Sequence, residues 1–238
     1  MNSSRQKEIL GIIPARARSK RIVKKSLVPL GEKNLIQYTL EAGEKSSSID
    51  RLVLSTDDPK IIQFASGFDI EIPFTRPKEL ATDNSSSFEV VQHCLNWMKE
   101  NEAYFPDAVI LLQPTCPFRD KDDIDSAISQ YIRSQKECLI SVCEVTQHPC
   151  DCIKMDGDKI VAADRPLGGG NRDFPEYYFI NGAIHITSVG FLNRKHEFYD
   201  DSPELFVMSK EHSIDIDNVF DLRIAESLIR YKKKEKSH

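Results

Sequence analysis

Short runs of apolar, often β-branched residues alternate along the chain with longer segments in which apolar side chains recur every three or four residues. The short runs predict strands, and the longer segments predict amphipathic helices. We expect strands at 9–13, 51–55, 108–112 and 139–143, and helices at 35–45, 59–66, 86–100 and 122–133. Strands and helices that alternate in this way are typical of a sheet covered by helices. The predicted fold is therefore α/β, with a mostly parallel, Rossmann-like twisted sheet flanked by helices.

The alternating pattern stops between residues 144 and 178. This stretch contains closely spaced turn signals with little apolar periodicity between them: His148-Pro149, Asp156-Gly157, Arg165-Pro166 and Gly168-Gly169-Gly170. We predict an inserted arm here, built as a long hairpin. Beyond it, we expect a strand at 182–187 and a closing helix at 219–231. The 238 residues suit a single domain, 1–238, that contains the arm at 144–178.

The composition excludes several function classes. A formal net charge of −5 at pH 7 argues against a general nucleic-acid-binding protein. The sequence has no run of about 18 apolar residues, so we predict no membrane contact and a cytoplasmic location. The six cysteines contain no C-x-x-C pair, and several lie in apolar runs, as reduced core cysteines do. Cys150 and Cys152 could touch a metal, but no second pair matches them, and we expect neither disulfides nor structural zinc.

The segment after the first predicted strand is strongly basic. We call residues 16–25 the basic loop, because six of these ten residues are arginine or lysine. These cations repel one another unless an anion lies among them, and they follow the carboxyl end of a strand, where such sheets bind ligands. A nucleoside triphosphate suits them, because Arg and Lys bind phosphate oxygens and Ser19 adds a hydroxyl donor. The alternative is a solvated surface loop.

Two common nucleotide-binding motifs are absent from the sequence. It has no G-x-x-x-x-G-K-[ST] segment and no G-x-G-x-x-G after the first strand, so a P-loop protein and a dehydrogenase are both disfavoured.

Asp215 and Asp217 indicate a metal site. Residues two apart in an extended segment face the same side, so both carboxylates can bind one hard cation. The alternative is two exposed aspartates at the entry to a helix.

Five segments, in this order, together resemble the CMP-sialic acid synthetases: IIPARARSKRIVKKS, RPKELATDNSSS, LLQPTCPFR, FPEYYFINGAIHIT and SIDIDNVFDLRIAE. The resemblance covers nearly the whole chain. It implies a fold of the nucleotidyltransferase type and a cytidylyltransferase that transfers CMP from CTP to the anomeric hydroxyl of a nine-carbon acidic sugar, with release of pyrophosphate. It also implies Mg²⁺ as the cofactor and a homodimer in which the arm contacts the second subunit.

The resemblance assigns roles to individual residues. Positions that match contacts to the nucleotide are Arg16, Ser19, Lys20, Lys25, Ser26, Arg76 and Ser86. Positions assigned to the sugar site are Gln113, Arg172, Asn181 and His185. Arg165 and Arg172 both lie in the arm, where similar enzymes supply a cation for the sugar carboxylate, and we choose Arg172 over Arg165. Asp215 and Asp217 match the metal-binding pair and, with Arg16 and Lys20, form the expected catalytic set. The family usually has Asn at the position of Ser26 and Tyr at that of His185.

Two other functions fit part of the sequence. Synthetases for the eight-carbon sugar Kdo share the fold, but they tend to carry S-T-R-L-P and Q-G-D-E-P segments. This chain has Ser19-Lys20-Arg21 and Gln113-Pro114-Thr115 there. A non-catalytic nucleotide-binding or regulatory protein would need the basic loop, but it has less use for a pair of metal-binding carboxylates. We therefore expect an enzyme, and the sequence leaves open which acidic sugar it uses.

Overall fold

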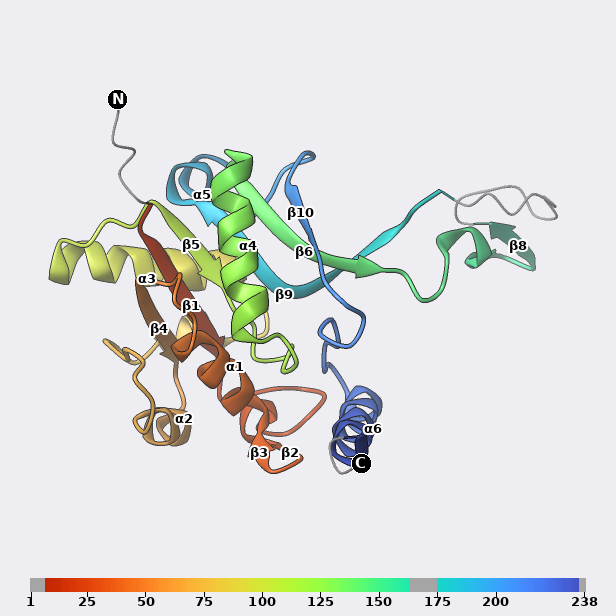
Figure 1. Cartoon of the computed structure of the whole chain (residues 1–238), viewed down its shortest axis with the longest axis horizontal. Coiled ribbons are helices and arrows are strands. Elements are labelled where there is room, and N and C mark those ends of the chain that lie inside the picture. The colour runs from red at the N-terminus through yellow and green to blue at the C-terminus, as the bar shows by residue number, and fades with distance from the viewer. Residues whose placement is uncertain (1–6, 163–174, 236–238) are drawn as a thin grey trace.

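A computed structural model describes residues 7–162 and 175–235 of the chain. Its central sheet has six strands in the order β10-β6-β9-β5-β1-β4 (Figure 1). These strands are β1 (Ile9–Ala15), β4 (Arg51–Thr56), β5 (Ala108–Leu111), β6 (Cys138–Glu144), β9 (Tyr178–Ser188) and β10 (Glu204–Val207). The predicted α/β fold is confirmed. The sheet is mixed, because β9 runs antiparallel to both of its neighbours while β1 is parallel to β4 and β5, and β10 to β6.

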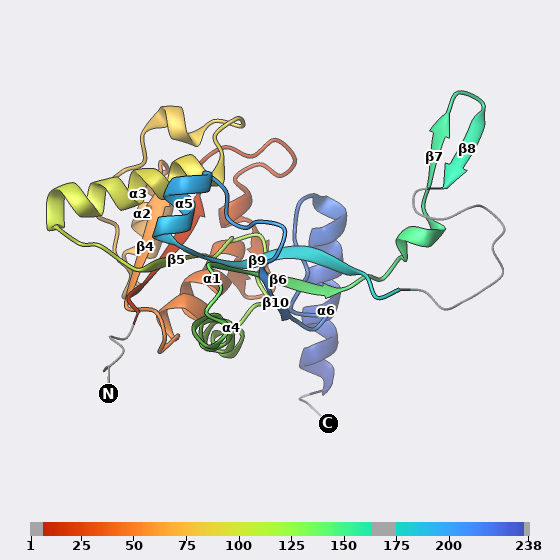
Figure 2. The same cartoon turned by 90° about the horizontal axis from the view of Figure 1, so that it is seen from above.

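Helices cover both faces of this sheet (Figure 2). The core on one face includes apolar side chains from α1 (Leu35–Glu44), α2 (Pro59–Ala65) and α4 (Lys121–Ser134). The core on the other face includes side chains from α3 (Ser87–Glu102) and α5 (Val189–Lys195). Every residue of β5 is buried, as expected for a strand covered on both faces.

Side-chain caps fix where several helices begin. Ser86 and Glu89 form a capping box at the start of α3, and Asp120 and Asp123 form one at the start of α4. Ser188 caps α5 by accepting a hydrogen bond from the Phe191 amide at 3.1 Å. Such caps provide partners for the first N–H groups of a helix, which have none within the helix itself. The start of α3 is thereby fixed within the turn that borders the site described below.

A third, smaller core joins the basic loop to the end of the chain. Its buried members are Ile22, Leu30, Leu35, Ile216 and Ala225. They come from the basic loop, the short hairpin of β2 (Pro29–Leu30) and β3 (Lys33–Asn34), α1, the segment before α6 and α6 (Val219–Glu235) itself. The Ile216 amide also donates to the Thr115 carbonyl at 2.8 Å. This core therefore holds Asp215 and Asp217 next to the basic loop.

The predicted arm contains a hairpin of β7 (Ile153–Asp156) and β8 (Lys159–Ala162), which form a sheet of their own at a distance from the main sheet (Figure 1). Residues 163–174 of the arm lie outside the described residues. Within the described ranges, no helix combines the length and the apolar character needed to cross a membrane. The cytoplasmic location and the single domain 1–238 stay predictions.

Candidate functional site

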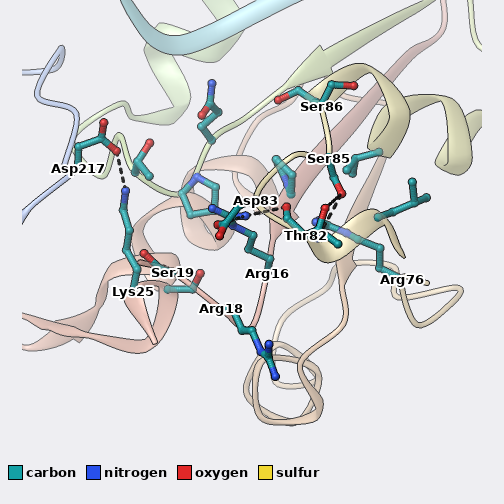
Figure 3. A pocket seen from close by; sticks show the side chains of 18 of the residues that line it. Arg16, Arg18, Ser19, Lys25, Arg76, Thr82, Asp83, Ser85, Ser86 and Asp217 are labelled. Carbon is teal, nitrogen blue, oxygen red and sulfur yellow. Dashed lines mark hydrogen bonds and ion pairs between the residues drawn. The ribbon is translucent and has the colours of Figure 1, made fainter. Parts of the chain in front are cut away.

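A cavity of about 300 Å³ opens beyond the carboxyl ends of β1 and β5 (Figure 3). The basic loop, the turn before α3, the segment after β5 and Asp217 all contribute to its lining. Eight of the residues predicted from the sequence line it: Arg16, Ser19, Lys25, Ser26, Arg76, Ser86, Gln113 and Asp217. Its volume lies at the lower end of the usual range for small-molecule sites.

A hydrogen bond connects the basic loop to the end of the neighbouring strand β4. The Ala17 amide donates to Asp57 Oδ1 at 2.8 Å, and Asp57 directly follows β4, the parallel neighbour of β1. At Lys24 the backbone enters the left-handed region, with φ of 51°, and begins the short 3₁₀ helix Lys25–Leu27. The side chain of Lys25 is only 14% exposed. These contacts and this turn place the cation of Lys25 in the cavity wall.

Asp83 pairs with two cations of the basic loop. Its carboxylate lies 2.9 Å from Arg16 Nη1 and 2.9 Å from Lys20 Nζ. Arg16 Nη1 also donates to the Thr82 carbonyl at 2.8 Å. The hydrogen bond from Lys20, followed by the positive charges of Lys20 and Arg16, lowers the pKa of Asp83 below its ordinary value. Lys20 does not line the cavity, but its ion-pair partner Asp83 does.

Asp217 pairs with two further cations of the same loop. Its Oδ2 lies 2.7 Å from Arg21 Nη1, and its Oδ1 lies 3.0 Å from Lys25 Nζ. The hydrogen bond from Lys25 is the largest cause of a lowered pKa at Asp217, and Arg21 adds to the effect. Four of the six cations in the loop are therefore matched by carboxylates from the opposite walls.

Arg76 contributes a cation that is almost completely buried. It is 4% exposed, its Nε donates to Ser55 Oγ at 3.0 Å, and its Nη2 donates to the Ser55 carbonyl. Burial lowers the pKa of Arg76 to about 10, Asp57 opposes this shift, and Arg16 adds a smaller lowering. The guanidinium therefore keeps its charge at neutral pH. Because a buried charge is costly unless it is paired, this cation favours an anion in the cavity next to it.

The N-terminus of α3 contributes three serines to the cavity lining. Ser86 Oγ accepts from the Glu89 amide at 3.2 Å, and the Glu89 carboxylate accepts from the Ser86 amide at 2.7 Å. Ser85 and Ser87 flank this cap. The amino end of a 16-residue helix carries partial positive charge, which favours an anion in addition to the cations of the basic loop.

Asp215 and Asp217 lie on an extended segment, on either side of the fully buried Ile216. The pKa of Asp215 is raised above its ordinary value, mainly because neighbouring protein removes water from its carboxyl group. The negative charge of Asp217 raises this pKa further, whereas a hydrogen bond with Thr115 lowers it. A cation near both carboxylates would relieve this repulsion. Asp217 lines the cavity and Asp215 does not. Residues two apart in an extended segment can nevertheless share one side, an arrangement that suits a hard divalent ion.

A second group of possible metal ligands lies elsewhere. Asp120, Asp123 and His212 bring their ligand atoms within 4.8 Å of one another. Asp120 and Asp123 cap α4, and His212 Nδ1 lies 2.7 Å from Asp123 Oδ2. Capping and this ion pair account for the arrangement, and none of the three residues lines the cavity. The group is therefore not the pair expected from the sequence.

The residues assigned to the sugar are placed differently from one another. Gln113 lines the cavity. Asn181 is 1% exposed, and its amide binds Ser141 Oγ at 2.5 Å and Ser213 Oγ at 2.8 Å. Its polar atoms therefore have partners inside the protein, where they connect β9 to β6 and to the segment before Asp215. Arg172 lies outside the described residues.

His185 lies on β9, opposite Leu111 of β5. Its ring centroid is 6.0 Å from that of Phe198 and 6.2 Å from that of Tyr199. Burial lowers its pKa to about 4, so the ring is neutral at pH 7. Its buried Nδ1 has no hydrogen-bond partner among the described residues, and His185 is not part of the cavity lining.

Two residues that shape the site, Asp83 and Arg119, had no predicted role. Asp83 stands in one of the five resembling segments, but its pairing with the basic loop depends on the folded turn. Arg119, 1% exposed, donates to the Ala183 carbonyl at 2.7 Å and to Thr39 Oγ1 at 2.9 Å, and so connects β9 with α1 beside the segment after β5. An arginine six residues after Gln113, at the end of an apolar strand and its loop, was the available signal.

Residues 10–166 match the family model described as cytidylyltransferase. The chain is 33% identical over 233 residues to the N-acylneuraminate cytidylyltransferase of Escherichia coli O18:K1:H7, covering 96% of this chain but 54% of that protein. It is 31% identical to the CMP-N,N'-diacetyllegionaminic acid synthase of Legionella pneumophila and to the pseudaminic acid cytidylyltransferase of Campylobacter jejuni. Each of these two matches covers 93% of this chain and 96% of the relative. The resemblance predicted from the five segments is confirmed.

Solved structures share the fold at lower identity. The CMP:2-keto-3-deoxy-manno-octonic acid synthetase complexed with CTP matches with a TM-score of 0.69 and 15% identity, over 94% of this chain and 99% of that chain. The 4-diphosphocytidyl-2C-methyl-D-erythritol synthase of Anaerococcus prevotii matches with a TM-score of 0.63 and 14% identity, over 94% of this chain and 97% of that one. These two likenesses concern the fold alone.

Proposed function

Because this chain belongs to the cytidylyltransferase family, we propose that it transfers CMP from CTP to the anomeric hydroxyl of a nine-carbon acidic sugar of the sialic acid type, with release of pyrophosphate. The observation that carries the proposal is the cavity at the carboxyl end of the sheet, where the cations of Arg16, Lys25 and Arg76 line one small space. The names of its relatives, which include N-acylneuraminate, legionaminic acid and pseudaminic acid, support an acidic sugar as the acceptor.

The cations position the triphosphate and neutralise its charge. Transfer at phosphorus depends mainly on alignment and on electrostatic stabilisation, which matches a site rich in Arg and Lys. Arg16 and Lys20 offset the charge that grows on pyrophosphate as it leaves, and Lys25 holds the phosphates from the other end of the loop. Ser19, Ser26 and Ser86 offer hydroxyl groups to the nucleotide.

Asp215 and Asp217 are the residues that would hold Mg²⁺. Bound there, the ion would polarise phosphate oxygens. Asp217 is paired with Lys25 and Arg21, so these cations must find other partners before its carboxylate can bind a metal ion. The triphosphate offers those partners, and we infer that nucleotide binding frees Asp217 for its role as a ligand.

The sugar is proposed to lie on the side of the cavity formed by Gln113. The Gln113 Nε2 atom lies close to Gly182 of β9, 3.6 Å from the position that a Cβ would take there. Asn181 fixes this part of β9 through its hydrogen bonds with Ser141 and Ser213. His185 lies further along the same strand, outside the cavity lining. Arg172 stays the proposed partner of the sugar carboxylate.

We also propose a homodimer that forms through the arm. Met155 of β7 lies directly opposite Ile160 of β8, and Ile153 lies on the same side of the hairpin. All three side chains are more than half exposed. An isolated two-stranded sheet is marginally stable at best, so a surface that covers this apolar face is expected, and a second copy of the chain supplies one.

The test is a pyrophosphate-release assay with CTP, Mg²⁺ and a panel of acidic sugars, with nucleotide binding measured in parallel by calorimetry. We expect release with at least one of N-acetylneuraminate, legionaminate and pseudaminate, and much less with ATP, GTP or UTP. Binding of CTP without release for any acidic sugar would favour the non-catalytic alternative. Release with Kdo alone would favour the eight-carbon sugar.

A further inference from the structure

One carboxylate at the mouth of the cavity has no part in the roles proposed so far. Asp83 stands on the turn between the 3₁₀ helix Lys78–Ala81 and α3, and its side chain meets Arg16 and Lys20 of the opposite wall, each at 2.9 Å (Figure 3 shows the pair with Arg16). These are two of the cations that we assign to the triphosphate. An acid within the protein therefore occupies donors that the nucleotide needs.

The position of Asp83 is built into an ordered turn. The Thr82 amide donates to Ser85 Oγ at 3.2 Å, and Thr82 Oγ1 lies 2.8 Å from the same Ser85 Oγ. Ser85 Oγ also donates to the Glu79 carbonyl at 2.9 Å. Arg16 adds a hydrogen bond to the Thr82 carbonyl at 2.8 Å. Because these bonds hold the backbone on both sides of Asp83, its carboxylate is directed at the basic loop by the fold.

A carboxylate and a phosphate are bound by the same groups. Both accept hydrogen bonds from guanidinium and ammonium N–H groups at similar distances, so the donors that face Asp83 cannot at the same time face a phosphate. The side chains of Arg16 and Asp83 are about one-third exposed and that of Lys20 is 76% exposed. Ion pairs at such exposure are weak enough to exchange partners readily.

We propose that Asp83 takes the place of a phosphate group in the nucleotide-free site, and that the triphosphate binds by exchange with it. This inference rests on the proposed function, since it takes CTP as the ligand. Exchange makes Asp83 a determinant of nucleotide affinity: a ligand must replace both ion pairs, and a triphosphate carries enough charge to do so. A ligand with little negative charge does not displace the carboxylate and is disfavoured.

The experiment compares CTP affinity, measured by calorimetry without divalent metal, in the full-length wild type and three variants. Asp83→Asn keeps the shape of the side chain and removes its charge, and we expect it to bind CTP about 10-fold more tightly. Asp83→Glu keeps the charge and should stay close to the wild type. Asp122→Asn is the matched control, because Asp122 is also paired with a lysine, Lys121 at 2.6 Å, and does not line the cavity.

The outcomes separate this inference from the proposed function. If the wild type binds CTP and Asp83→Asn binds it equally or more weakly, Asp83 serves only to hold the turn and the loop together, and the inference is overturned while the proposed function stands. If Asp83→Asn binds CTP more tightly but the wild type releases no pyrophosphate with any acidic sugar, the inference stands and the proposed function is wrong. If Asp122→Asn raises CTP affinity by the same factor, the increase comes from the change in net charge alone, and the inference is overturned.

Discussion

At the carboxyl end of the sheet, charged side chains from three walls already have partners within the chain, whereas several apolar side chains in the described part of the arm are exposed. Asp83 and Asp217 pair with the basic loop at distances of 2.7–3.0 Å. In and beside the arm, Met155 is 66% exposed and Phe179 is 58% exposed. We propose that the first region binds a small anion by exchange with these carboxylates. The second needs a surface of the size that another protein chain offers.

One strand connects the two regions. β9 pairs with β6 near the arm, where Tyr178 lies opposite Glu144, and it ends beside β5, where Ser188 lies opposite Ala108. Along the way it passes Gly182, which lies against Gln113 of the cavity. A single strand therefore runs from the arm to the Gln113 side of the cavity. We nevertheless expect the two regions to act through different interactions.

The largest expected effect is at the nucleotide end. Asp217→Asn keeps the size of the side chain and removes one negative charge from the proposed metal site, so turnover should fall by roughly two to three orders of magnitude, or about 3–4 kcal/mol of transition-state stabilisation. Steady-state pyrophosphate release with the best sugar measures this loss. CTP affinity without metal should change far less, because Arg16 and Arg76 remain. Turnover near that of the wild type would rule out Asp217 as a metal ligand.

At the arm, Met155→Asp should weaken dimer association by about 100-fold, because a charge replaces an apolar side chain at the centre of the proposed contact. Val161→Asp is the matched control, since Val161 is exposed on the opposite side of the same hairpin, across from Lys154. Sedimentation at a series of concentrations gives both dissociation constants. A monomeric wild type at micromolar concentrations, or equal losses in both variants, would contradict the proposed interface.

The strand between the regions gives a pH-dependent prediction at His185. Its pKa is about 4 in the folded chain against 6.5 for a free histidine, so the unfolded chain binds more protons between these pH values. The stability from the neutral ring is complete above pH 6.5 and is lost as the pH falls toward 4, by about 2 kcal/mol at pH 5. His185→Phe should lack this part of the acid sensitivity. Urea unfolding of both proteins at pH 7.5 and pH 5 measures the difference, and parallel losses would show that His185 does not titrate as described.

Elements fixed by local interactions could be predicted from the sequence, whereas those fixed by contacts between distant segments could not. Strands such as β1 and β4, and helices such as α1 and α4, follow from local periodicity, and their predicted bounds agree with the structure to within a few residues. The central antiparallel position of β9 depends on pairing between distant segments, which periodicity does not encode. Two elements without a strong local pattern, the seven-residue α5 and the four-residue β10, were not predicted.

The site shows the same division. The basic loop and the Asp215–Asp217 pair could be recognised because residue type and spacing alone indicated their chemistry. The carboxylate of Asp83, the burial of Arg76 and the internal hydrogen bonds of Asn181 could not, because each depends on contacts between segments far apart in the sequence. The role of Arg172 stays a prediction, since it lies outside the described residues.

The smallest effect compares two helix caps. Ser86 caps α3 at the cavity and Ser188 caps α5 away from it, and each accepts a hydrogen bond from a backbone amide. Replacing either with Ala should lower the free energy of unfolding by about 1 kcal/mol, because one of the first N–H groups of the helix loses its partner. Only Ser86→Ala should also weaken CTP binding, by several-fold, since Ser86 lines the cavity and Ser188 does not. Thermal melts and calorimetry on both variants measure the two effects. If Ser188→Ala weakens CTP binding as much as Ser86→Ala does, the loss comes from general destabilisation, and Ser86 must be removed from the nucleotide contacts.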